Sequence, residues 1–262
     1  MTDRKNWKTG LSIGRVSEEA LEHAAKAQLD VVEISGVAGD DVSLWKEIPS
    51  WSAKTGVTVW SIHLPFRWRT EPVANPATWD PVFWKQTYDQ DKELIEYAGQ
   101  AGVKVAVIHP SGEPIPDWDR PAQLRASIQH LGELSDVCKK NGMTLAVEDL
   151  PRTCLGNTGE EMKQIMESNS DLRVCFDVNH LLKEDHASFV EKVGKYIITT
   201  HISDYDFVDE RHQFPMQGQI NWRKLQSLLE NADYNGPFLY ETMPMGHVWE
   251  DVRPNHEALK NL

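Results

Sequence analysis

Seven side chains that could bind a metal ion or transfer a proton stand at the ends of short apolar runs. In VCFDVNHLL (174–182), the run Val174–Phe176 ends in Asp177, and an imidazole follows at His180. Across the chain, such ends occur at Glu33, His63, His109, Glu148, Asp177, His201 and Glu241. One polar end is usually a helix cap or a salt-bridge partner. Seven indicate a shared site, provided that the fold brings them together.

The three late carboxylates, Glu148, Asp177 and Glu241, would repel one another if they met in ionised form inside an apolar mouth. Protonation relieves such repulsion, but a bound divalent cation is the better explanation. With His201 the set offers three oxygen ligands and one nitrogen, a mixture that suits Mn²⁺, Co²⁺, Mg²⁺ or Zn²⁺. The sequence therefore predicts one divalent metal ion held by these four residues.

The runs that end in these residues alternate with helical patterns. Eight runs predict strands, at 11–14, 30–35, 57–65, 104–110, 144–150, 172–180, 196–204 and 236–242. Ser17 is placed as the N-cap of the first helix, and Asn141–Gly142 ends a helix over about 120–140. Other helical patterns cover 78–102, 160–168, 189–195 and 221–232, with a closing one after Trp249. This alternation favours a parallel sheet covered by helices.

The spacing of the polar ends predicts a closed barrel. Glu33 and Glu241 are 208 residues apart over six intervals, about 35 each, close to the roughly 31 per unit of a (β/α)8 barrel of about 250 residues. A doubly wound open sheet is the alternative, but LSIGRVSEEA (11–20) lacks its GxGxxG loop. No linker-like segment divides the chain. We predict one α/β domain, a (β/α)8 TIM barrel over residues 1–262, with the polar ends on its active face.

Several motifs resemble the xylose isomerase-like superfamily of sugar isomerases and epimerases, whose barrels are similar to those of tagatose epimerases and endonuclease IV. The motifs span nearly the whole chain and are IHLPF (62–66), VIHPSGEP (107–114), LAVEDLPRT (145–153), CFDVNH (175–180), HISDYD (201–206), ERHQFPMQGQINW (210–222) and FLYE (238–241). The epimerase branch implies metal ligands at the same four positions, Glu148, Asp177, His201 and Glu241.

The resemblance also implies roles for residues around the metal. His180 corresponds to a substrate or second-metal ligand, and Arg211 to an arginine that contacts substrate oxygens. The endonuclease branch implies further ligands at His63, His109 and His212, so a second metal ion stays open. The segment PMQGQINW (215–222) departs from the usual Pro-Gly-x-Gly pattern, which puts the loop shape near Gln217 and Gln219 in doubt.

Loops after the early strands are predicted to complete the substrate pocket. Aromatic faces pack against the C–H face of a sugar ring, and a carboxylate can accept a hydroxyl hydrogen bond. The predicted substrate-binding residues are His63, His109, His180, Arg211, His212, Glu113, Phe66 and Trp68. The remaining histidines lie in helical or loop contexts and are predicted to be structural: His23, His130, His186, His247 and His256.

Together these residues predict a metal-dependent sugar isomerase or epimerase. Glu148 and Glu241 are the expected acid/base pair: one removes a proton beside a carbonyl, the metal stabilises the ene-diolate, and the other returns the proton. A dehydratase or lyase acting on a keto-sugar or keto-glycoside is the main alternative, because the same enolate can expel a neighbouring group. An endonuclease IV-like phosphodiesterase and a non-catalytic sugar-binding barrel are less favoured.

The composition limits the class of partner. The 262 residues include 27 basic and 40 acidic side chains, a formal charge of −13 that would repel a phosphate backbone. No segment approaches the roughly 20 apolar residues that span a bilayer, and the three cysteines lack CxxC spacing. We expect a cytoplasmic protein that acts on a small sugar or sugar derivative, without nucleic-acid or membrane partners; homo-oligomer formation stays open.

Overall fold

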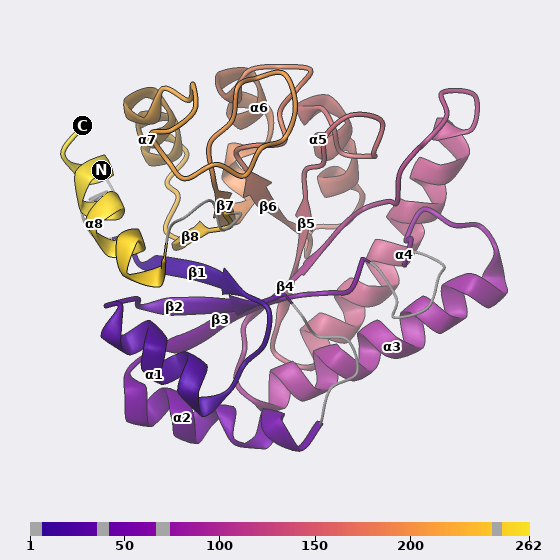
Figure 1. Cartoon of the computed structure of the whole chain (residues 1–262). Helices are drawn as coiled ribbons and strands as arrows, with labels where there is room; N and C mark the ends of the chain where they lie inside the picture. Colours follow the sequence, from indigo (N-terminus) through magenta and orange to yellow (C-terminus); the bar gives the residue numbers. More distant parts are fainter. Residues whose placement is uncertain (1–6, 36–41, 67–73, 243–247) are drawn as a thin grey trace.

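The computed structural model describes residues 7–35, 42–66, 74–242 and 248–262. Eight parallel strands close into a barrel in chain order, as the sequence predicted (Figure 1). Each strand pairs with the next along the chain, and β8 pairs with β1. The strands are β1 (Thr9–Ile13), β2 (Val31–Ile34), β3 (Thr58–His63), β4 (Val105–Ile108), β5 (Thr144–Glu148), β6 (Arg173–Asp177), β7 (Ile197–Ile202) and β8 (Phe238–Tyr240).

Helices surround the barrel, and several that follow one another in the chain pack against each other (Figure 1). They are α1 (Glu18–Lys26), α2 (Ile48–Thr55), α3 (Pro81–Gln100), α4 (Arg120–Lys140), α5 (Gly159–Ser168), α6 (His186–Val193), α7 (Trp222–Asn231) and α8 (Trp249–Lys260), with short 3₁₀ turns η2 (Val42–Lys46) and η3 (Gly194–Tyr196). The Ser17 hydroxyl caps α1 by accepting from the Ala20 amide, as predicted. Helix α2 was not predicted, although Pro49 near its start and Gly56 at its end are typical of helix boundaries.

Side chains alternate between the helix-facing core and the barrel interior. In β5 and β6, Ala146 and Cys175 lie in the interior, so two residues later Glu148 and Asp177 face inward at the carboxyl ends of their strands. In contrast, Val147, which lies between Ala146 and Glu148 in β5, points outward and packs in the core against the surrounding helices. The alternation of side chains along each strand therefore places the polar residues in a ring at the carboxyl end of the barrel, above an apolar interior.

Two register shifts adjust this alternation in β3 and β7. The pairing of β2 with β3 skips Trp60, and the pairing of β6 with β7 skips Ile198. Both skipped residues pack against the small cluster inside the barrel. Because a one-residue slip reverses the side chains that follow, these bulges set the direction in which His63 and His201 point.

The helices of the described residues include none that is both long enough and apolar enough to cross a membrane. One domain over residues 1–262 stays a prediction, as does the cellular location, and homo-oligomer formation stays open.

Candidate metal centre and active site

Potential ligand atoms from four strands, from the residues directly after β4 and β8, and from the loops after β6 and β7 meet at the carboxyl end of the barrel. They form three overlapping groups, and within each group the candidate ligand atoms lie within 4.8 Å of one another. We call their union the mouth cluster: His63, His109, Glu148, Asp177, His180, His201, His212 and Glu241. The four residues predicted to bind the metal, Glu148, Asp177, His201 and Glu241, make up one of the groups.

Glu148, the last residue of β5, lies at the centre of the mouth cluster and is only 1% exposed. Its Oε2 atom is 2.9 Å from His63 Nε2 and 3.2 Å from His109 Nε2. Its Oε1 atom is 3.1 Å from His201 Nδ1 and 3.6 Å from His180 Nδ1. One carboxylate therefore faces imidazoles from four other positions.

Asp177, the last residue of β6, is completely buried. Its Oδ1 atom accepts the Asn179 amide at 2.7 Å. Its Oδ2 atom has no hydrogen-bond partner among the described residues; it lies 3.6 Å from His180 Nε2 and 3.9 Å from His201 Nδ1. A buried carboxylate oxygen without a partner is costly, and a cation held between these side chains would satisfy it. The donor set and this oxygen fit a divalent metal ion.

His201, on β7, is completely buried and uses both ring nitrogens. Its Nδ1 atom lies 3.1 Å from Glu148 Oε1 and 3.2 Å from Glu241 Oε2. Its Nε2 atom lies 3.0 Å from Glu33 Oε1, across the barrel on β2. Glu241 directly follows β8, and its side chain is 29% exposed, so this carboxylate is open to the mouth.

The charges of the mouth cluster are strongly coupled. Burial lowers the pKa of His63, but the Glu148 carboxylate outweighs burial and raises it to about 9. Burial raises the pKa of Glu148, but His201 and His109 outweigh it and hold the pKa well below its usual range. Burial raises the pKa of Asp177 to about 6, against the opposing effect of His180 and His212. A metal ion bound here would compete with protons on these imidazoles.

The loop after β7 adds a second layer to the mouth. The Asn179 side-chain oxygen accepts the Arg211 amide at 3.0 Å and also the His212 amide. It thereby ties this loop to the DVNH segment that carries Asp177. The Arg211 guanidinium is half exposed and pairs with Asp206 at 2.9 Å. His212 Nδ1 donates to the Glu241 backbone oxygen at 3.2 Å.

The predicted substrate-binding residues of the early loops fall into three situations. Phe66 is 40% exposed and stacks on the His109 ring, with 4.7 Å between ring centroids. It forms an open aromatic surface beside the mouth cluster. Glu113 lies further out and is tied to the loop after β5, 3.3 Å from the Thr153 hydroxyl and 3.6 Å from Arg152. Trp68 lies outside the described residues.

Sequence reasoning assigned no role to several residues that support the mouth. Glu210 Oε2 lies 3.3 Å from His180 Nε2, and its other oxygen accepts from Arg152 at 2.7 Å. The Asp149 backbone oxygen accepts from His180 Nδ1 at 2.8 Å, and Asp149 Oδ1 accepts the Asp177 amide. Asp149 directly follows Glu148 in the sequence, and Glu210 precedes Arg211, so adjacency to predicted site residues was the available signal.

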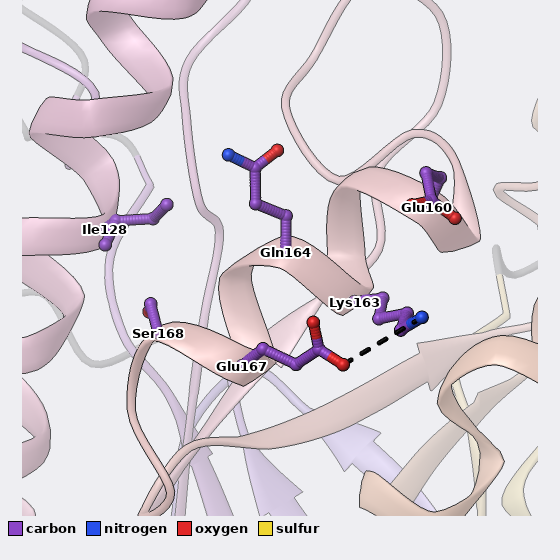
Figure 2. A pocket seen from close by; sticks show the side chains of 6 residues that line it. All are labelled: Ile128, Glu160, Lys163, Gln164, Glu167 and Ser168. Carbon is purple, nitrogen blue, oxygen red and sulfur yellow. Dashed lines mark ion pairs between the residues drawn. The ribbon is translucent and has the colours of Figure 1, made fainter.

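A separate hollow of about 470 Å³ lies on the outer surface, between α4 and α5. Figure 2 shows its lining, in which Lys163 and Glu167 form an ion pair at 3.9 Å. It contains no member of the mouth cluster, and its charged side chains are exposed. The mouth cluster is therefore the better candidate for chemistry.

Two curated proteins are similar to this chain in sequence. MJ1311 and MJ1614, two uncharacterized proteins of Methanocaldococcus jannaschii, are 28% and 23% identical over 186 and 149 residues. These matches cover 67% and 57% of this chain, and span about three fifths of the relatives' own lengths (61% and 59%).

Solved structures align over almost the whole chain. A D-tagatose 3-epimerase-like protein superposes with a TM-score of 0.83 at 24% identity, covering 97% of this chain and 96% of that one. D-psicose 3-epimerase from Clostridium cellulolyticum H10 superposes with a TM-score of 0.77 at 19% identity, covering 95% of this chain and 89% of that one. The 3-keto-D-glucoside 4-epimerase YcjR of E. coli superposes with a TM-score of 0.78 at 17% identity, covering 98% of this chain and 100% of that one.

At these identities, the structural likeness establishes the barrel fold. The sequence also matches the xylose isomerase-like TIM barrel family over residues 21–262, which confirms the resemblance inferred from the motifs. The chain therefore belongs to the xylose isomerase-like TIM barrel family.

Proposed function

We propose that this protein is a divalent-metal-dependent isomerase or epimerase of a sugar or sugar derivative. The observation that carries the proposal is the meeting of two glutamates at one nitrogen. Glu148 Oε1 and Glu241 Oε2 lie 3.1 Å and 3.2 Å from His201 Nδ1, although they come from β5 and β8. Their convergence, with an Asp177 oxygen close by that has no hydrogen bond, suits a metal centre flanked by two carboxylates.

In this proposal, Glu148 and Glu241 are the acid/base pair. One carboxylate removes the proton from the carbon beside the substrate carbonyl, and the other returns a proton to the same or the neighbouring carbon. A divalent ion bound by Glu148, Asp177, His201 and Glu241 would supply Lewis-acid stabilisation of negative charge on the substrate oxygens. Mn²⁺, Zn²⁺, Co²⁺ and Mg²⁺ all suit this donor set.

The surrounding side chains suit a small polyhydroxylated substrate. Phe66 offers an exposed ring face beside His109 for the C–H face of a sugar. His180 and His212 lie near the metal group, where ring N–H groups can donate to hydroxyls. Three of the similar structures bear epimerase names that mention tagatose, psicose or a 3-keto-glucoside. These names support a keto-sugar as the first substrate class to test.

Hydrogen exchange tests the proposal whichever product is formed. The Mn²⁺-loaded enzyme is incubated with keto-hexoses and 3-keto-glucosides in deuterated water. We expect deuterium at the carbon beside the carbonyl, and we expect Glu148→Gln and Glu241→Gln to abolish it. Glu167→Gln, in the outer hollow, is the matched control and should retain uptake. Retained uptake in both site variants would refute the acid/base assignment.

The products of the same incubation separate epimerisation from elimination. An epimer or an isomer supports the proposal as stated. An unsaturated product or a released aglycone would instead place the protein among the dehydratases or lyases, since the same enolate can expel a neighbouring hydroxyl or glycosidic oxygen.

A second candidate function is favoured by the two flanking ligand groups. His63, His109 and Glu148 form one group, and Asp177, His180 and His212 form the other, so each shares a carboxylate with the central group. Clustered divalent ions are typical of phosphodiester cleavage. Metal analysis that finds two or three ions per chain, together with cleavage of abasic-site DNA, would support this candidate over the epimerase. The formal charge of −13 weighs against a DNA substrate.

A further inference from the structure

Glu33 is a buried carboxylate on the side of the barrel opposite His201. It lies in β2, is 0% exposed, and has a strand register that places it beside Ser12 on β1 and Ser61 on β3. Both hydroxyls donate to it, Ser61 at 2.7 Å and Ser12 at 3.3 Å. Its third partner is His201 Nε2, at 3.0 Å across the interior.

These contacts fix the direction of the Glu33 carboxylate. Ser61 bonds Oε2, whereas Ser12 and His201 both approach Oε1. No lysine or arginine pairs with Glu33 among the ion pairs of the described ranges; its ionisable partner is the His201 imidazole. A buried carboxylate is costly unless its oxygens are hydrogen-bonded, and of the three partners of Glu33 only His201 belongs to the mouth cluster.

The contact with Glu33 determines which nitrogen of His201 is free to bind a metal. An imidazole nitrogen that donates a hydrogen bond carries a proton, and this leaves the lone pair of the other nitrogen for coordination. Nε2 faces the Glu33 acceptor, whereas Nδ1 faces Glu148 and Glu241. A flipped ring would present Nε2 to the metal group and leave Glu33 without its donor.

We propose that Glu33 is a positioning residue for the metal centre: it accepts the Nε2 proton of His201 and so presents Nδ1 to the metal. The inference rests on the proposed metal site. It assigns to β2, which contributes no ligand to that site, control over the orientation and basicity of a ligand on β7. Carboxylate partners of this kind typically change metal affinity by roughly 10- to 100-fold.

Three variants of the full chain test this role. Glu33→Leu removes the acceptor, and Glu33→Gln keeps the shape and a neutral acceptor. Thr200→Val is the matched control: it removes a buried hydroxyl from the same strand as His201, one that donates to the Pro237 backbone oxygen, away from the mouth cluster. Mn²⁺ affinity is measured by calorimetry, and the His201 Nε2–H proton is followed by ¹⁵N-edited NMR of the Zn²⁺-loaded protein.

The expected order of Mn²⁺ affinity is wild type equal to Thr200→Val, then Glu33→Gln several-fold weaker, then Glu33→Leu roughly 10- to 100-fold weaker. The downfield Nε2–H signal should persist in the control, shift in Glu33→Gln and vanish in Glu33→Leu. If Glu33→Leu does not fold, Glu33→Gln decides, and an affinity equal to that of the wild type overturns the role.

The outcomes also separate this inference from the metal centre itself. If the wild-type protein binds Mn²⁺ and the Glu33→Leu variant binds it equally well, the positioning role alone is overturned. A wild-type protein that binds no divalent ion overturns the proposed metal centre, and the positioning role with it.

Discussion

At the carboxyl end of the barrel, His63 is 3% exposed and lies 2.9 Å from the Glu148 carboxylate. Near the opposite end, His256 of α8 is 1% exposed, and its Nε2 atom donates to the Trp7 backbone oxygen at 3.2 Å. Burial lowers the pKa of both rings, and for His256 it prevails, so that the pKa falls to about 4. For His63, the carboxylate prevails and the pKa rises to about 9.

Burial of a histidine alone therefore does not indicate a functional site. Around His256 aromatic rings pack together: Trp7 stacks on Phe238 at 4.6 Å between centroids, and Phe238 and His256 meet edge to face at 5.6 Å. Such packing stabilises the fold. The mouth cluster instead brings together charged groups that shift one another's pKa values. Such clusters are typical of functional sites rather than of sites that only stabilise the fold. Changes at the mouth should therefore alter chemistry, and changes at the α8 end should alter stability.

The largest expected effect comes from Glu148→Gln. Because this carboxylate faces His63, His109 and His201, its loss should abolish tight Mn²⁺ binding and reduce substrate proton exchange by at least about 10³-fold. Calorimetry and deuterium uptake measure the two effects. The free energy of unfolding should change far less than activity does. Near-normal deuterium uptake would contradict the claim that changes at the mouth alter chemistry more than stability.

The sequence predicted the barrel well because all eight strands are short apolar runs, and helical patterns separate them everywhere except between β2 and β3, where α2 was missed. It also selected six residues of the mouth cluster, since their positions at strand ends follow from the period of the fold, whereas His180 and His212 were implied by the family resemblance. It could not assign a partner to Glu33, because that contact crosses the barrel between β2 and β7. Similarly, Glu210 reaches His180 through a loop whose path the local pattern does not fix.

The next effect sharpens the contrast through pH. In metal-free protein the raised pKa of His63 contributes stability that is fully present below 6.5, the ordinary value, and is lost as pH rises through about 9. The stability advantage of wild type over His63→Gln, measured by denaturant unfolding in chelator, should therefore fall across this window, by on the order of 3 kcal/mol. An advantage that does not change with pH would contradict the ion pair with Glu148.

His256 should behave in the opposite way. His256→Ala removes the bond to Trp7 and leaves a cavity beside Phe238, so we expect a loss of about 2 kcal/mol in the free energy of unfolding near pH 7.5. The contribution of its neutral ring is present above pH 6.5 and is lost as pH falls towards about 4. Proton exchange by the folded variant should match the wild type; a large loss of activity would show that the two ends are not independent.

The smallest effect concerns the turn that departs from the Pro-Gly-x-Gly pattern. Met216 occupies the position of the usual first glycine and has a φ of +72°, in the left-handed region, with its amide bonded to Asp204. The turn is thus formed without that glycine, and Gly218 is needed because a Cβ there would clash with the Tyr205 backbone. Met216→Gly should raise the free energy of unfolding by about 1 kcal/mol at most, without a change in Mn²⁺ affinity. A clear loss of stability would show that the Met216 side chain stabilises the turn.

The most direct test of the metal centre is an anomalous difference map from crystals grown with Mn²⁺. We expect one dominant peak within roughly 2.0–2.3 Å of an oxygen from each of Glu148, Asp177 and Glu241, and of Nδ1 of His201. A map with no peak among these four side chains, while Mn²⁺ is bound elsewhere or not at all, would contradict it.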